Sequence, residues 1–305
     1  MPVYQIAGFT LESPIELPSL SQSLIETRLK VELTIKVNII PSFTTIQCSR
    51  PLDGGEYQWL DGGFRLFHPK VGEIVLQQGF IYWQQLHPVD IEGFRTFLLN
   101  TILPAYAILK DMLSLHVSAV SVAGQAIAFQ GHSGAGKSTL AAMLMQRGYP
   151  VITEDLGIVE LNEQTAIMRA GVPYFRLWRQ TLKYLNETPQ PHNRAWLNKG
   201  KYYQSIEDDK FCLHPQPIRA IYFLKEPEQG NSVAIKTMTG FSAAKALLNS
   251  YFFGLQQNNT TKTEQLFKKT MVLANQTLCF ELVRPKNFAM TEQVLDALVQ
   301  HWGTF

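Results

Sequence analysis

Residues 131–138 match a complete phosphate-binding motif of the form G-x-x-x-x-G-K-[ST]. An apolar segment at 126–129 predicts a strand before the motif, and residues 137–147 predict a helix after it, with Gly148 at its end. Glycines allow backbone N–H groups to turn inward on an anion, and the start of a helix adds partial positive charge. We therefore expect this loop to bind the phosphates of a nucleotide.

Each position of the motif has an expected task. Lys137 is expected to reach the β- and γ-phosphates, Ser138 to bind Mg²⁺, and Thr139 to lie near the α-phosphate. The helix that follows is apolar nearly all round, which predicts a buried helix that holds the loop in place. The expected nucleotide-binding residues are Gly131, His132, Ser133, Gly134, Ala135, Gly136, Lys137, Ser138 and Thr139, and the expected cofactors are ATP and Mg²⁺.

An acidic pair, Glu154-Asp155, follows a short apolar segment at 151–153 and lies 18 residues beyond Lys137. One helix, one turn and one strand use up this distance, so we expect the pair at the carboxyl end of a strand adjacent to the phosphate-loop strand. Ligands bind at that edge of open α/β sheets. A carboxylate there can hold Mg²⁺ or take a proton from a nucleophile, and a solvated turn is the plainer alternative.

His116 can be placed by strand register. If Ala123-Gly124 is a two-residue hairpin turn, Val122 pairs with Gln125 and His116 lies opposite Gly131. The imidazole then lies either near the transferring phosphoryl group or in the core, where it orients the loop.

Residues 115–159 resemble the HPr kinase/phosphorylase family, and more closely its shorter branch, which includes kinases of lasso-type ribosomal precursor peptides. The similarity covers the LHxSAV, GxSGAGKSTLAA and RGY segments and the acidic pair, with weaker similarity at 175–178 and 217–222. It implies a P-loop kinase core of the HPr kinase and PEP carboxykinase type. The implied activity is ATP- and Mg²⁺-dependent phosphorylation of a serine, and HPr kinase itself also performs phosphorolysis.

The resemblance implies catalytic roles for Asp155, His116 and Lys137, and metal binding by Ser138, Asp155 and Glu154. Glu154 stands where the family usually has Asp, so which acid is base and which is metal ligand stays open. The C-terminal part lacks the HPr kinase signature, and residues 1–90 do not resemble the N-terminal domain of HPr kinase. The acceptor, phosphorolysis and the oligomeric state, with a homo-oligomer among the options, stay open.

The chain divides by pattern into two parts. Residues 1–88 are expected to form a β-rich region of unassigned role, and residues 89–305 an α/β P-loop kinase domain. Strands are expected at 31–40, 64–67, 73–77 and 79–85. Pro104 should break or kink a helix over 90–113 into two pieces, and residues 186–215 should form a long mobile loop.

Composition limits the function classes. The chain has 305 residues, 46% hydrophobic and 17% charged, with a net charge of +2, which argues against a nucleic-acid coat or a polybasic membrane anchor. Cys48, Cys212 and Cys279 lack disulfide or metal-site spacing. No signal peptide or membrane-spanning segment is expected, and we predict a cytoplasmic protein.

Further side chains are weighed against plainer roles. Three arginines, Arg176, Arg179 and Arg219, could neutralise phosphate charge in the transition state, with an ordinary surface position as the alternative. Two lysines of the expected loop, Lys199 and Lys201, could fold over the substrate or the nucleotide. We expect Trp178 and Trp196 to pack in the protein and not to stack on a base. The sequence favours a kinase acting on a serine of a protein or precursor peptide. The alternatives are a metabolite kinase or PEP-carboxykinase-like enzyme, and a nucleotide-binding regulator without phosphotransfer.

Overall fold

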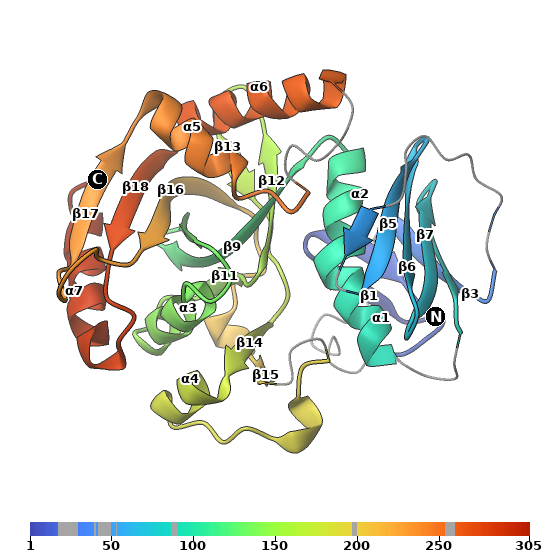
Figure 1. Ribbon diagram of the computed structural model, residues 1–305, viewed down its shortest axis with the longest axis horizontal. Coiled ribbons are helices and arrows are strands. Elements are labelled where there is room, and N and C mark those ends of the chain that lie inside the picture. Colours follow the sequence, from blue (N-terminus) through green and yellow to red (C-terminus); the bar gives the residue numbers. More distant parts are fainter. Residues whose placement is uncertain are drawn as a thin grey trace.

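The computed structural model describes residues 1–17, 30–39, 41, 50–52, 54–86, 91–196, 200–253 and 260–305. It has a mixed α/β fold in which an N-terminal sheet lies at one end and a larger α/β part at the other (Figure 1). The division expected between residues 88 and 89 falls outside the described residues, as do Cys48 and Lys199.

The N-terminal sheet has eight strands in the order β1-β2-β3-β8-β7-β6-β5-β4. From β4 to β8 the neighbours are antiparallel, whereas β2 with β3 and β3 with β8 are parallel. The strands are β1 (Val3–Ile6), β2 (Phe9–Glu12), β3 (Leu33–Val37), β4 (Arg50–Leu52), β5 (Gly55–Leu60), β6 (Gly63–His68), β7 (Gly72–Gln77) and β8 (Phe80–Gln84). The four strands expected from alternating apolar residues are therefore present as β3, β6, β7 and β8.

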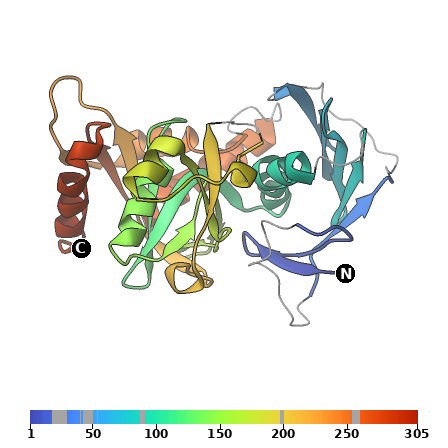
Figure 2. The ribbon, with the colours of Figure 1, turned by 90° about the horizontal axis from the view of Figure 1, so that it is seen from below.

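A helical segment lies between the two parts (Figures 1 and 2). It runs as α1 (Ile91–Phe97), a π-helical turn η2 (Leu98–Ile102) and α2 (Leu103–Leu109), so the segment has two α-helical pieces, as expected, and the π turn that divides them lies just before Pro104. The N–H of Leu103 donates to the carbonyl of Leu98, and this wider turn leaves Pro104 in the first turn of α2, where its missing N–H is tolerated. Phe94 stacks on Trp83 with ring centroids 4.1 Å apart, which joins the segment to the N-terminal core.

The larger sheet is built around β9 (Leu113–Val122) and β10 (Gln125–Gln130), the predicted hairpin. Its path is β10-β9-β12-β13-β16-β18-β17, β10 also pairs with β16, and β11 pairs with β9. The remaining strands are β11 (Val151–Thr153), β12 (Leu156–Leu161), β13 (Ala166–Met168), β16 (Gln216–Lys225), β17 (Ala234–Met238) and β18 (Leu278–Val283).

Helices cover both faces of this sheet. Ile127 and Phe129 pack with α3 (Lys137–Gln146) and α7 (Thr291–Trp302), whereas Ala126 and Ala128 pack with α5 (Gly240–Leu248) and α6 (Thr260–Gln276). Alternate side chains of β10 thus enter two separate cores, as expected of a strand buried on both faces.

The region expected as a loop at 186–215 contains ordered elements. β15 (Lys201–Ser205) pairs antiparallel with β14 (Tyr174–Trp178). α4 (Arg179–Tyr184) directly follows β14, and short 3₁₀ turns occur at η3 (Pro191–Asn193) and η4 (Asp208–Lys210). Tyr202 and Tyr203 are buried there, so the loop prediction is wrong. The two buried tyrosines stabilise β15, and the polar, proline-containing sequence around them gave no strand pattern from which β15 could be predicted.

Candidate active site

The phosphate loop connects β10 to α3 with the backbone that its glycines allow. Gly134 and Gly136 have φ angles of +84° and +92°, in the left-handed region. A Cβ on Gly131 would lie 2.8 Å from the Cβ of Ala135, so the loop closes tightly on itself. Leu140, Ala141, Ala142 and Leu144 of α3 are buried, which confirms the prediction of a buried helix that anchors the loop.

Lys137 lies inside this loop with 6% of its surface exposed. Its Nζ donates to the carbonyl oxygen of Gly131 at 2.8 Å and, more weakly, to that of His132 at 3.4 Å. Burial lowers the pKa of Lys137, and the nearby carboxylates of Asp155 and Glu154 oppose that shift. The ammonium group is therefore held inside the loop by two of the loop's own carbonyl groups.

The acidic pair reaches the same sheet edge by a different route from the one expected. β11 does not adjoin β10, because β9 lies between them and pairs antiparallel with both. β10 and β11 are consequently parallel to each other, and their carboxyl ends meet at one edge. The hairpin register predicted for β9 and β10 is confirmed from Val122–Gln125 to Val117–Gln130, which places His116 next to the start of the loop.

The side chains of Glu154 and Asp155 point in different directions because a tight turn lies between β11 and β12. β11 and β12 pair in succession with β9, through Thr153–Ala119 and Leu156–His116. Between them, the N–H of Leu156 donates to the carbonyl of Glu154 at 2.8 Å, and Asp155 has a φ of +69°. A non-glycine residue in this region is strained, and such strain concentrates at functional sites.

Glu154 faces the phosphate loop. The Oγ of Ser138 donates to its Oε1 at 2.5 Å, and only 4% of the Glu154 surface is exposed. Burial, and next the charge of Asp155, raise the pKa of Glu154 to about 7, although Arg176 and the Ser138 hydrogen bond oppose the shift.

Asp155 lies between the imidazole of His116 and the guanidinium of Arg176. Its Oδ1 is 3.1 Å from the Nδ1 of His116, and its Oδ2 accepts a hydrogen bond from the Nη2 of Arg176. Burial alone would raise the pKa of Asp155, but Arg176 and then His116 outweigh burial and hold it below its usual range. Burial lowers the pKa of His116 in spite of Asp155, which favours a neutral ring that presents Nδ1–H to the carboxylate.

The donors present fit a magnesium ion shared with a nucleotide. Among the described residues, no group of three or more His, Cys, Asp or Glu side chains could hold a metal alone. Ser138 and Glu154 provide one hydroxyl and one carboxylate in direct contact. Mg²⁺ is commonly held by one or two carboxylates together with phosphates and water, so this pair suits it better than Asp155, which is ion-paired.

A cavity of about 730 Å³ opens over the phosphate loop, Asp155 and Arg176, and Glu154 is not among its lining residues. It is lined by six of the expected loop residues, Ser133, Gly134, Gly136, Lys137, Ser138 and Thr139, and by His116, Asp155 and Arg176. Gly131 and Ala135 are buried in the loop framework, and the side chain of His132 points to solvent.

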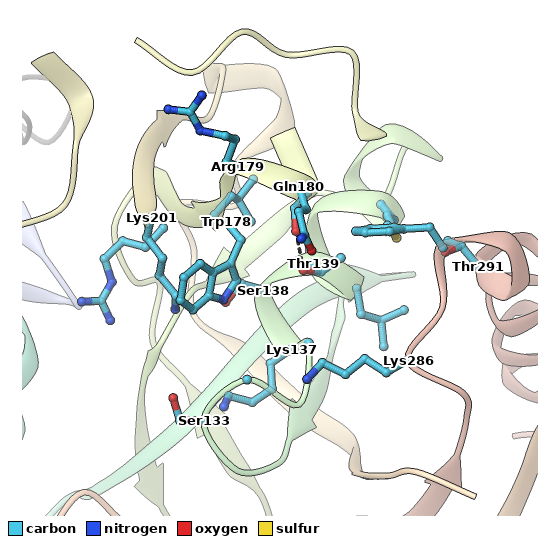
Figure 3. A pocket seen from close by; sticks show the side chains of 18 of the residues that line it. Ser133, Lys137, Ser138, Thr139, Trp178, Arg179, Gln180, Lys201, Lys286 and Thr291 are labelled. Atoms are coloured by element: carbon cyan, nitrogen blue, oxygen red, sulfur yellow. Dashed lines mark hydrogen bonds between the residues drawn. The ribbon is translucent and has the colours of Figure 1, made fainter. Parts of the chain in front are cut away.

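The further side chains that the sequence singled out have different outcomes. Arg179 and Lys201 line the cavity, whereas the guanidinium of Arg219 lies over the ring of Phe305, 5.2 Å from its centroid, and outside the lining. Trp178 is 43% exposed and lines the cavity near Lys201 (Figure 3), so its expected packing role is wrong. Trp196 packs edge-on against His68 and Phe97, as expected.

The C-terminal part supplies lining residues that sequence reasoning missed. β18 is parallel to β16, and β16 to β10, so Arg284 follows β18 at the edge where the phosphate loop follows β10. The Nη2 of Arg284 donates to the carbonyl of Ala135 at 2.6 Å. Lys286, Phe288 and Thr291 line the same cavity. The strand order could have predicted these residues, because basic residues that follow a strand parallel to β10 lie at the same sheet edge as the phosphate loop.

Comparison with known proteins agrees with this geometry at the level of the domain. A family model described as "ABC transporter" matches residues 115–271, half of the chain. The chain belongs to this family. Within the ABC transporter match lie β9, β10, the phosphate loop, α3 and the acidic turn, which make up a P-loop nucleotide-binding domain.

Comparisons with solved structures and with curated proteins do not identify a close relative. A solved HPr(Ser) kinase/phosphatase from Coxiella burnetii is similar with 11% identity, over 63% of this chain and 97% of that one, at a TM-score of 0.35. None of the curated proteins matches the chain. In the described part of the chain, no helix is both long and apolar enough to cross a membrane.

Proposed function

We propose that this protein is an ATP- and Mg²⁺-dependent kinase that transfers the γ-phosphoryl group to a serine hydroxyl of a protein or precursor peptide. The observation that supports it is the divided acidic turn, where Glu154 contacts Ser138 of the phosphate loop and Asp155 contacts His116 in the same cavity. In this proposal the phosphate loop binds the nucleotide, Ser138 and Glu154 form the metal site, and Asp155 orients the acceptor hydroxyl from the wall of the same cavity as the loop.

On the nucleotide side, the loop N–H groups and Lys137 would hold the β- and γ-phosphates. Ser138 and Glu154 would hold Mg²⁺, which when bound neutralises phosphate charge. Arg284 and Lys286 add positive charge beside Gly136 and Gly134, at the rim of the same loop.

On the acceptor side, Asp155 would orient the serine hydroxyl and take its proton as the new O–P bond forms. The bond between the γ-phosphorus and the β–γ bridging oxygen breaks, and ADP leaves. His116 fixes the carboxylate through Oδ1, while Arg176 is placed to stabilise the charge of the transferring group. Asp155 with a low pKa suits a loose transition state in which the hydroxyl loses its proton late.

The experiment measures transfer of labelled γ-phosphate to serine-containing proteins and peptides. We expect Lys137→Ala to abolish nucleotide-dependent transfer, and Asp155→Asn to slow it by about 10²–10⁴-fold with nucleotide binding retained. Undiminished transfer by the variant carrying both substitutions would overturn the proposal.

The family match favours a second candidate, an ATPase that passes the γ-phosphoryl group to water. The same assay distinguishes the two, because a hydrolase forms ADP and free phosphate at full rate without any acceptor. A kinase forms ADP in proportion to phosphorylated acceptor.

A further inference from the structure

The cavity has two chemically different ends on either side of the phosphate loop. One end contains Asp155, Arg176 and Lys201. The other is formed by α3, α4 and the segment from η6 (Phe288–Met290) into α7, and Figure 3 places Thr291 there, across the loop from Lys201 and Trp178. These elements line the cavity with the apolar side chains of Leu140, Met143, Phe288 and Val294 and with the polar side chains of Thr139, Gln180, Thr181 and Thr291.

The orientation of a bound nucleotide follows from this arrangement. If the γ-phosphate faces Asp155, as the proposed function requires, the triphosphate crosses the loop and its α-phosphate points away from the acids. The nucleoside must then enter the end formed by α3 and α7. Four apolar side chains form much of the wall at this end, and its polar groups are uncharged hydroxyls and an amide, which suits a flat aromatic ring better than phosphate or Mg²⁺.

The apolar end is built from side chains that are already fixed. Leu140, Met143 and Val294 are 3%, 4% and 3% exposed and belong to the core beneath the sheet. The ring of Phe288 is stacked on Tyr184 of α4, with centroids 4.7 Å apart and planes at 20°. A ligand therefore meets a wall whose shape exists before binding, which limits the entropic cost of association.

Its polar groups include the exposed Gln180 and Thr291, of which only 8% is exposed. The amide of Gln180 is exposed at the mouth, and Thr291 brings a hydroxyl to the opposite side. Both groups can donate and accept hydrogen bonds, so they can meet the mixed donor and acceptor edge of a nucleobase. Either amide orientation is open to Gln180, which predicts recognition of purines as a class with little discrimination between adenine and guanine.

We propose that this end is the purine-base subsite, with Phe288 and Met143 against the ring faces and Gln180 and Thr291 at the ring edge. The inference rests on the proposed nucleotide-dependent function and adds the position and chemical class of the base. The aromatic contact should contribute substantially, because stacking of a base on an aromatic ring is sensitive to alanine substitution.

The experiment compares ATP with inorganic tripolyphosphate, which carries the same phosphate chain and no base, in the presence of Mg²⁺ and the full-length chain. We expect Phe288→Ala to weaken ATP binding by about 5- to 100-fold and to leave tripolyphosphate binding unchanged. Phe267→Ala is the matched control, since Phe267 is 43% exposed on α6, which covers the other face of the sheet, and should change neither affinity. Thr291→Val, which keeps the shape of the side chain, should weaken ATP alone.

The outcomes distinguish failure of the base subsite from failure of the proposed function. Equal ATP affinity in wild type, Phe288→Ala and Thr291→Val would overturn the base subsite and leave the proposed function standing. Equal weakening of ATP and tripolyphosphate by Phe288→Ala would also overturn it, because the ring would then act through the phosphate loop. Failure of the wild type to bind either ligand would overturn the proposed function itself.

Discussion

The Oγ of Ser138 donates a hydrogen bond of 2.5 Å to Glu154, while the neighbouring carboxylate of Asp155 is turned to His116 and Arg176. Two consecutive acids thus contact different partners, because the strained turn at Asp155 points their side chains in different directions. In the proposed function, the carboxylate beside the loop serine would hold Mg²⁺, and the one beside the histidine would orient the acceptor hydroxyl.

We predict that Glu154→Gln and Asp155→Asn change different kinetic parameters. Loss of the Glu154 charge should raise the Mg²⁺ concentration needed for half-maximal transfer by about 10- to 100-fold. Asp155→Asn should lower kcat with little change in the Mg²⁺ requirement, because it removes the group that takes the proton. Titrating Mg²⁺ at saturating ATP measures both, and identical behaviour of the two variants would contradict the division of roles.

The buried Glu154 carboxyl predicts a pH dependence of stability in metal-free protein. Burial, then the charge of Asp155, raise its pKa from 4.5 to about 7, so its contribution to stability is fully present below pH 4.5 and is lost as the pH rises to about 7. Glu154→Gln should unfold like the wild type near pH 4.5 and at a higher temperature above pH 7. The gain should be about 2–4 °C for each kcal/mol relieved.

Thermal unfolding in a chelator measures this effect, and Glu160→Gln is the control, since the Glu160 side chain is 44% exposed and is already ion-paired with Arg169. A wild type that is more stable than Glu154→Gln above pH 7 without metal would contradict the prediction.

Local patterns in the sequence were sufficient for the centre of the site. The hairpin of β9 and β10, the phosphate loop and α3 are contiguous, and their turn, glycine and periodicity signals act over a few residues. The same signals gave the register that places His116 beside Gly131.

The features that could not be predicted from the sequence depend on contacts between segments far apart in the chain. β14 and β15 pair across more than twenty residues, and Arg284 reaches Ala135 from the far end of the chain. β9 lies between β10 and β11 because β11 pairs with the free edge of β9 and not with β10, and a local sequence pattern does not determine this choice. The opposite directions of Glu154 and Asp155 depend on one positive φ at a residue that rarely adopts it.

Gly136 should tolerate a side chain poorly for a reason specific to nucleotide binding. A Cβ at Gly136 would lie 2.5 Å from the Nη2 of Arg284, which holds the loop through the carbonyl of Ala135. Gly148 has a similar φ of +90°, but a Cβ there would meet no atom within 4 Å. Both alanine variants should lose about 1 kcal/mol of stability from backbone strain.

Only Gly136→Ala should also weaken ATP binding, by about tenfold or more, because the loop or Arg284 must shift. Calorimetric titration with MgATP, beside thermal unfolding, separates the two effects. Equal ATP affinities in Gly136→Ala and Gly148→Ala would show that Arg284 does not constrain the loop.

Arg176 should set the pH at which Asp155 can act. Its guanidinium is the group that most strongly lowers the pKa of Asp155 against the effect of burial. Without that charge the carboxylate takes up a proton at a higher pH, so the acidic limb of kcat/KM for Arg176→Gln should move upward and transfer should slow by about 10²–10³-fold at neutral pH. Arg179→Gln is the matched control, because Arg179 lines the same cavity but bonds the hydroxyl of Tyr202. Its acidic limb should stay where the wild type has it. An unmoved limb in Arg176→Gln would mean that the ionisation of Asp155 does not control the reaction, and the proton of the acceptor hydroxyl would then have to leave by way of His116.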